Sequence, residues 1–83
     1  MTERQTSVAR SLGVEMYGMT KATSPEEYKA SSDRYHLIQS IASALVTPKA
    51  LEEIQQSAAK YQEEILISTG YQLIKGSWKF VGN

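Results

Sequence analysis

Five residues close together in the chain could do chemistry: Tyr28, Lys29, Arg34, Tyr35 and His36. Aromatic rings can stack on a nucleobase, and cationic side chains can hold a phosphate. Placed between the subunits of an oligomer, this set would suit a protein that binds or sequesters a nucleotide. The alternative is that the tyrosines lie at the edge of a core and that the charged side chains are only solvated.

Catalytic groups are sparse. His36 is the only histidine. Asp33 lies three residues earlier, close enough on a helix for a hydrogen bond that could set up a general base. No nucleophile stands at a recognised spacing from a base, and no glycine-rich loop is present to hold a phosphate. The pairs 52–53 and 63–64 are acidic but lack the loop spacing of a calcium site. With one histidine and no cysteine, a zinc site is not expected either. We therefore expect no enzymatic activity, metal or cofactor.

The composition excludes several classes of protein. The chain has 83 residues, enough for a single domain over 1–83. Nine basic and nine acidic residues cancel, so the net charge gives no footprint for nucleic acid or for an anionic membrane. The longest apolar runs are too short to span a bilayer. The polar start, MTERQTSVARS, lacks a signal region, and cysteine is absent. We expect a soluble, cytoplasmic protein that does not enter the membrane.

Two pairs of a hydroxyl residue and a proline mark helix starts. Ser24 is followed by Pro25, and Thr47 by Pro48. The hydroxyl can cap the free N–H groups of the first turn, and proline fits the first helical position, where no N–H is needed. Glu27 stands where it could reach back to the N–H of Ser24 and complete a capping box.

The apolar spacing extends both helices. In the predicted helix 25–45, apolar residues recur at steps of three and four and so share one face. They are Tyr28, Tyr35, Ile38, Ile41, Ala42 and Leu45. The predicted helix 48–68 carries a seam with heptad-like spacing. This 51–65 seam consists of Leu51, Ile54, Ala58, Tyr61 and Ile65.

Only Val46 and Thr47 link the two predicted helices, and so short a link is typical of antiparallel neighbours. Segment 24–69 therefore predicts an antiparallel αα-hairpin. A lone hairpin leaves a stripe uncovered on each helix, and a chain this short has little core of its own. We therefore expect the 51–65 seam to be the oligomer interface of a homo-oligomeric helical bundle.

The C-terminal segment 70–83 predicts a β-hairpin. Gly70 suits the end of the preceding helix. Alternating residues flank Gly76 and Ser77, which we take as the centre of a tight turn. The competing interpretation continues the helix to Lys75 and ends it at Gly76.

The same segment holds a cluster of aromatic residues: Tyr71, Trp78 and Phe80. They either cover the end of a small core or anchor an interface with another protein, where tryptophan and tyrosine contribute most. Lys75 and Lys79 lie among them, so stacking on single-stranded nucleic acid is a further interpretation. We take the cluster as the partner-binding site.

Residues 5–22 resemble the helix-turn-helix of phage repressor and Cro-type proteins. The residues that carry the resemblance are Gln5, Ala9, Leu12, Gly13, Val14, Met19 and Ala22. The resemblance implies a turn at the glycine and a second helix that reads DNA bases. The side chains that would read them are those of Glu15, Met16, Tyr17 and Thr20. The alternative, which we favour, is a short amphipathic helix with Val8 and Leu12 on the stripe that packs on the αα-hairpin.

Together these patterns predict a mainly α fold: an antiparallel αα-hairpin with a short N-terminal helix and a C-terminal β-hairpin or tail. The function that fits is a non-enzymatic interaction or adaptor protein. It would self-associate and bind or modulate a larger protein partner, as bacterial or phage accessory proteins do. A DNA-binding regulator acting through residues 5–22 and a nucleotide-binding protein are the alternatives.

Overall fold

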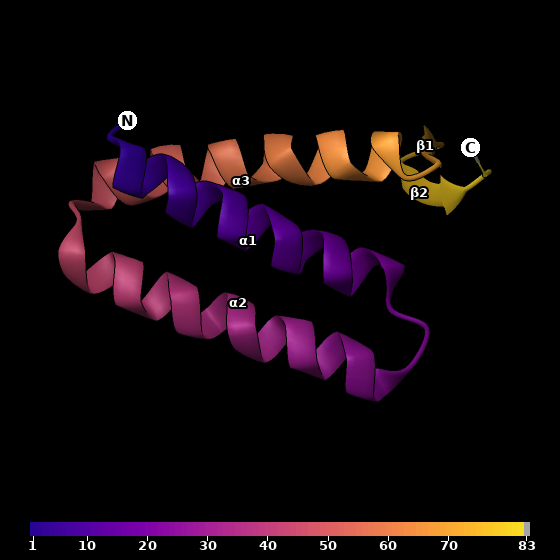
Figure 1. Ribbon diagram of the computed structural model, residues 1–83, viewed down its shortest axis with the longest axis horizontal. Helices are drawn as coiled ribbons and strands as arrows, with labels where there is room; N and C mark the ends of the chain where they lie inside the picture. Colours follow the sequence, from indigo (N-terminus) through magenta and orange to yellow (C-terminus); the bar gives the residue numbers. More distant parts are fainter. Residues whose placement is uncertain (83) are drawn as a thin grey trace.

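The computed structural model describes residues 1–82, so the last residue of the predicted segment 70–83, Asn83, lies outside the described residues. Three helices are followed by two strands: α1 (Glu3–Lys21), α2 (Pro25–Leu45), α3 (Pro48–Ser68), β1 (Tyr71–Ile74) and β2 (Ser77–Phe80). Figure 1 shows α1 lying between α2 and α3, with the hairpin of β1 and β2 at the far end of α3. The mainly helical fold with a small antiparallel sheet is as the sequence predicts.

A hydroxyl residue caps the start of each helix. Thr2 caps α1 in a reciprocal box, in which its side chain accepts from Gln5 N and the Gln5 side chain accepts from Thr2 N. Ser24 and Thr47 cap α2 and α3, which confirms both predicted helix starts. The Glu27 carboxylate, however, accepts a hydrogen bond from the N–H of Thr23, one residue before the predicted donor.

The predicted αα-hairpin is wrong as a description of the packing, because α2 and α3 barely touch each other and both pack on α1. The core consists of Ala9 and Leu12 of α1 with Ile54 and Ala58 of α3, all without exposed surface. The N-terminal helix is also longer than expected and spans 19 residues. The apolar stripe of α1 covers residues of α3 that a second copy of the chain was expected to cover.

The 51–65 seam is therefore covered at its centre within one chain. Ile54 and Ala58 are fully buried against α1, whereas Leu51, Tyr61 and Ile65 are half-buried. The reason for expecting a second copy on this seam, that a single chain could not cover it, does not hold for its central residues.

Glycines allow α1 to approach both neighbours closely. A Cβ atom on Gly13 would lie 2.8 Å from Tyr61 Cβ and 2.9 Å from the Ala58 carbonyl oxygen of α3. On Gly18, a Cβ atom would meet the hydroxyl of Ser31 on α2. Both glycines lie inside one continuous helix, so the turn at Gly13 that the helix-turn-helix resemblance implies is absent. Tertiary contact outweighs the cost of about 1 kcal/mol of a glycine in a helix.

Helix α2 is the least covered of the three. Its buried residues, Ser31 and Ala42, lie on the side that faces α1, and Tyr35 and Ile38 are half-buried on the same side. The predicted apolar face of α2 is therefore only partly in the core. The other large residues of that predicted face, Tyr28, Ile41 and Leu45, are each more than half exposed.

The C-terminal hairpin forms as predicted, with a different turn. Gly70, at φ 101°, follows the end of α3, and its carbonyl oxygen accepts from Val81 N at 2.8 Å. The last strand pair joins Ile74 to Ser77, which leaves Lys75 and Gly76 at the turn centre, with φ of 51° and 80°. Two positive φ values are typical of a type I′ turn, whose twist matches that of a hairpin. The turn centre thus lies one residue before the predicted one.

The chain is more open than a compact domain of its size. It exposes 5746 Å², whereas a compact monomer of 9.2 kDa exposes about 4,900 Å². Its radius of gyration is 13.3 Å, against about 12 Å for a compact chain of this length. Within the described residues, every helix is too short or too polar to cross a membrane. The exposed area is thus about 800 Å² larger than that of a compact monomer, in agreement with the elongated shape of 38 × 25 × 20 Å.

The contact at Gly13 gives a first test. Gly13→Ala should lower the free energy of unfolding by about 1–2 kcal/mol, because the new methyl group meets the backbone of α3, even though alanine favours the helix. Urea unfolding followed by circular dichroism, at one fixed protein concentration, measures the change.

Gly18→Ala is the matched control. Its methyl group meets mainly the Ser31 hydroxyl, which can rotate away, so stability should change by less than about 1 kcal/mol in either direction. A Gly13→Ala protein more stable than the wild type would contradict the close approach of α1 and α3.

Candidate interaction surfaces

The strand register gathers the aromatic residues of the C-terminal segment on one side of the hairpin. Tyr71 lies opposite Phe80, and Leu73 lies opposite Trp78. Residues opposite each other and residues two apart along a strand share a face, so all four side chains project to the same side. We call this the hairpin face. Leu73 was not among the residues predicted for this cluster, although its alternation with Tyr71 along the strand is sufficient to place it there.

Only part of the hairpin face is used to hold the hairpin in place. The Tyr71 ring packs edge-on against Phe80, with centroids 5.3 Å apart, and against Tyr17 of α1 at 6.4 Å. Leu73 and Phe80 remain 59% and 64% exposed, far above what a core residue shows. The hairpin face is thus fastened through Tyr71, with Trp78 half-buried and with Leu73 and Phe80 open to solvent.

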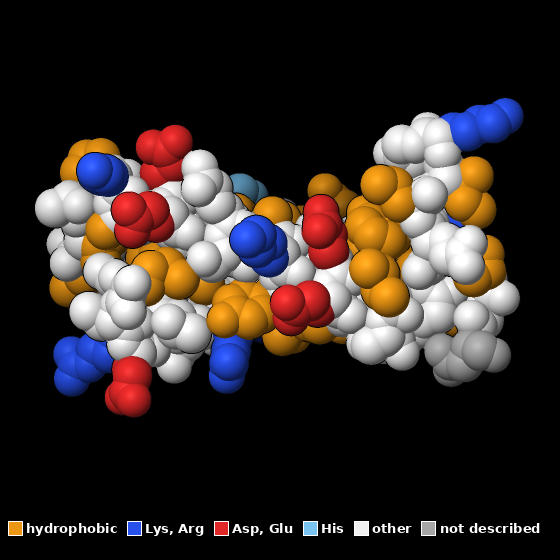
Figure 2. Space-filling model, turned by 90° about the horizontal axis from the view of Figure 1, so that it is seen from above, with side chains coloured by type: hydrophobic (Ala, Val, Ile, Leu, Met, Phe, Trp, Pro, Cys, Tyr) orange, Lys and Arg blue, Asp and Glu red, His pale blue; other side chains and the backbone are white. Residues whose placement is uncertain are grey.

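The hairpin face borders a hollow of about 450 Å³ beside α3. Ile67 and Glu63 line it from α3, and Tyr71, Leu73 and Trp78 line it from the hairpin. Figure 2 shows hydrophobic side chains gathered at the hairpin end of the molecule, next to a hollowed surface. An apolar concavity with a carboxylate at its edge can accept a hydrophobic side chain accompanied by a basic group.

A second apolar surface lies on α2. Leu37, Ile41 and Leu45 follow one another at intervals of four residues and are 62%, 56% and 78% exposed. We call these three residues the α2 ridge. Leu37 was not among the apolar residues predicted to share one face of this helix, whereas Ile41 and Leu45 were, because spacing alone does not show which apolar flank a neighbouring helix covers.

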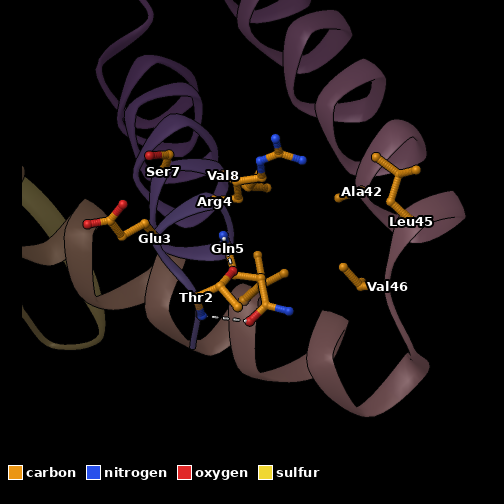
Figure 3. Close-up of a pocket in the computed structure, with 10 residues that line it drawn as sticks. Thr2, Glu3, Arg4, Gln5, Ser7, Val8, Ala42, Leu45 and Val46 are labelled. Carbon is orange, nitrogen blue, oxygen red and sulfur yellow. Dashed lines mark hydrogen bonds between the residues drawn. The ribbon is translucent and has the colours of Figure 1, made fainter.

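A cleft of about 690 Å³ opens beside the α2 ridge, between the first turns of α1 and the end of α2. Figure 3 shows Val8 on one side of this cleft and Ala42, Leu45 and Val46 on the other, with the Thr2–Gln5 capping box at its edge. Leu45 belongs to both the ridge and the cleft, so the apolar surface is continuous from one to the other.

The predicted ligand-binding residues lie away from the clefts described above. None of Tyr28, Arg34, Tyr35 and His36 lines either of them within this single chain, and a site between subunits stays a prediction. Tyr35 packs against the core, and its ring meets that of His36 edge-on at 5.6 Å.

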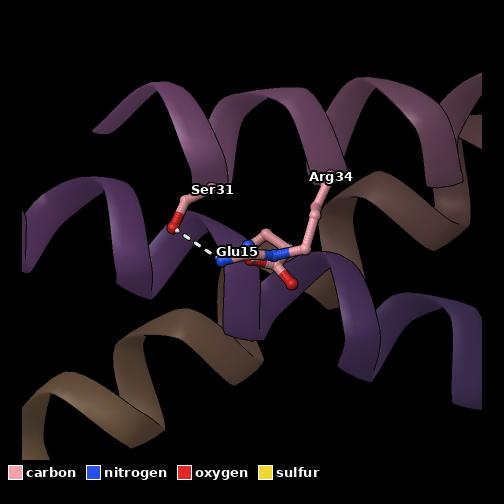
Figure 4. A network of polar contacts seen from close by, with 3 residues as sticks. All are labelled: Glu15, Ser31 and Arg34. Atoms are coloured by element: carbon pink, nitrogen blue, oxygen red, sulfur yellow. Dashed lines mark hydrogen bonds and ion pairs between the residues drawn. The ribbon is translucent and has the colours of Figure 1, made fainter. Parts of the chain in front are cut away.

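The charged side chains of this group already have partners. Arg34 donates through Nε to Glu15 Oε1 of α1 at 2.9 Å, and its Nη2 lies 3.4 Å from Ser31 Oγ (Figure 4). Lys29 Nζ lies 2.8 Å from Asp33 Oδ2. That hydrogen bond and the Asp33 charge raise the pKa of the Lys29 ammonium. The predicted hydrogen bond from Asp33 to His36 is not formed.

The side chains that the helix-turn-helix resemblance assigns to base reading are also engaged elsewhere. Glu15 pairs with Arg34, and Met16 packs against the core. Thr20 Oγ1 accepts from Gln62 Nε2 of α3 at 2.8 Å. These contacts point the side chains of Glu15, Met16 and Thr20 at α2, the core and α3, and the Tyr17 ring meets Tyr71 of the hairpin. The turn that the helix-turn-helix resemblance implies is absent, and the segment is one helix, which agrees with the favoured amphipathic helix.

Among residues 1–82, no group of three or more His, Cys, Asp and Glu side chains is placed to hold a metal ion. Comparison with known proteins gives no match: no family model, curated protein or solved structure is similar enough to indicate a family. The two apolar surfaces are therefore the features on which a functional argument can be built.

The hairpin face predicts a separation between stability and binding. Leu73→Ser removes a largely exposed side chain and should change the free energy of unfolding by less than about 0.5 kcal/mol. Tyr71→Ala removes the aromatic contacts to Tyr17 and Phe80 and should cost about 1–2 kcal/mol. Thermal unfolding of both variants measures the difference. A Leu73→Ser protein as unstable as Tyr71→Ala would show that the hairpin face belongs to the core.

Proposed function

We propose that this chain is a non-enzymatic interaction protein that binds a larger protein through the hairpin face. The observation that carries the proposal is the exposure of Leu73 and Phe80 on a face that Tyr71 fastens to α1. A contiguous exposed apolar patch costs solubility and, on a small protein, usually marks a binding surface. Its aromatic content is also typical of the residues that dominate binding energy.

The chemistry of the hollow defines the kind of partner. Trp78 and Ile67 provide apolar walls, and Glu63 provides a negative charge beside them. The partner would be a protein segment that inserts a hydrophobic anchor and places a lysine or arginine next to it. Binding would modulate that partner by occupying its surface, as an accessory protein does. The cysteine-free composition leads us to propose the cytoplasm as the compartment.

Photocrosslinking tests the proposed function at the surface itself. Phe80 would be replaced by benzoylphenylalanine in the cells from which the protein comes, and the control would carry the same group at Gln56, on the exposed polar side of α3. We expect one crosslinked protein from position 80 and none from position 56. Equal crosslinking from both positions, or none from position 80, would contradict the proposal.

A pair of substitutions then separates the two surfaces. Leu73→Asp places a charge in the hairpin face and should remove the crosslink from position 80, because the carboxylate would have to be desolvated. Ile41→Asp changes the α2 ridge instead and should leave that crosslink intact. The partner identified by the crosslink would then be purified without the crosslink, and calorimetry would measure its affinity for each of the two variants.

A further inference from the structure

The α2 ridge lies in a stretch that carries no charge. From residue 35 to residue 48 the chain has no Asp, Glu, Lys or Arg, although charged residues make up 22% of the whole sequence. Exposed helices of small proteins are normally rich in charge, and charged residues are depleted at the centres of interfaces. An uncharged helix half with three large exposed apolar side chains is therefore built for contact with another surface.

The size of the uncovered surface indicates what kind of contact would cover it. The chain exposes 5746 Å², about 800 Å² more than a compact monomer of its mass. A standard protein interface buries about 800 Å² on each partner. The α2 ridge, the cleft beside it and the hairpin face all contribute to this excess, which is close in size to one partner's share of such an interface.

We propose that the α2 ridge pairs with the α2 ridge of a second copy of this chain, with the two helices antiparallel about a two-fold axis at Ile41. A two-fold interface uses the same patch on both copies, so the patch has to complement itself. The regular spacing of the α2 ridge meets this condition. With Ile41 on the axis, Leu37 of each copy lies against Leu45 of the other.

The charged residues of α2 nearest the uncharged stretch, Asp33 and Arg34, already pair with Lys29 and Glu15 of the same chain. Helix α2 ends at Leu45, so Lys49 belongs to α3 and this register does not place it. The proposed α2 contact therefore depends on its apolar side chains.

The other apolar surface would not serve this purpose. Residues 70–82, which contain the hairpin face, include Lys75 and Lys79 and no acidic residue. Lys75 lies in the turn and Lys79 projects from the opposite side of the hairpin, but together they give the segment a net positive charge, so two hairpins that met would bring like charges near each other. Two copies of the 35–48 stretch bring together no charge at all. Like charges at an interface select against that pairing. This difference assigns self-association to α2 and leaves the hairpin face free for a different protein.

Cysteine crosslinking tests the register, because the chain contains no cysteine of its own. Under mild oxidation, Ile41→Cys should form a disulfide-linked dimer of twice the 9.2 kDa chain mass. The double variant Leu37→Cys with Leu45→Cys should crosslink as well. Leu37→Cys alone should not, because the two copies of residue 37 lie about 12 Å apart along the antiparallel helices.

Light scattering and sedimentation test the dimer without crosslinking. We expect the wild type to be a dimer at micromolar concentration, and Ile41→Asp, which sets two carboxylates on the axis, to raise the dissociation constant at least about 100-fold. Circular dichroism checks that Ile41→Asp remains folded, and Phe80→Asp is the control that should remain dimeric. A wild-type chain that stays monomeric at 100 micromolar, or a dimer that Phe80→Asp disrupts and Ile41→Asp does not, would overturn the proposal. The photocrosslink from position 80 does not depend on the dimer. Its absence would contradict the proposed function, whereas a monomeric wild type would contradict the pairing of α2 ridges, so the two failures can be told apart.

Discussion

The close packing of α1 against α3 at Gly13 is the contact on which the rest of the structure depends. Because Gly13 has no side chain, the backbone of α1 lies directly on Ala58 and Tyr61. This approach buries Leu12 and Ile54, and α2 adds only the half-buried Tyr35 and Ile38 to the edge of that core. Helix α2 is left with the opposite side of α1, where Ser31 and Ala42 fit closely but cover little area. The exposed α2 ridge is a consequence of that arrangement.

The two uncovered surfaces differ in chemistry, and this difference divides the proposed roles. The hairpin face is aromatic, lies next to a carboxylate and stands on a basic segment, which suits a partner that is not this chain. The α2 ridge is aliphatic and uncharged, which suits a copy of itself. They lie on different elements, α2 and the hairpin, so one dimer could present two hairpin faces. Such a bivalent arrangement would strengthen binding to a partner that carries two sites.

The features that could be predicted best from the sequence are those that depend on residues close together along the chain. The caps at Ser24 and Thr47, the glycine after α3 and the alternation in the hairpin depend on near neighbours along the chain, and these features were predictable. The pairing of helices depends on distant residues instead. The resemblance implied a turn at Gly13, and only the position of α3 shows that this glycine is a contact point inside a helix. Likewise, the structural role of Glu15 comes from its ion pair with Arg34, nineteen positions away in the sequence.

The candidate site could also be predicted only in part from the sequence. The hairpin aromatics could be found because strand alternation places them together. The exposed flank of α2 could not be found, since helical spacing does not say which neighbour covers which side.

The central claim, that α1 is one unbroken helix held on both sides, is tested most directly by amide hydrogen exchange measured by NMR. The account predicts that the amides of residues 12–16 are among the slowest to exchange, with no break at Gly13. Exchange at Gly13 and Val14 as fast as in the Lys75–Gly76 turn would contradict it.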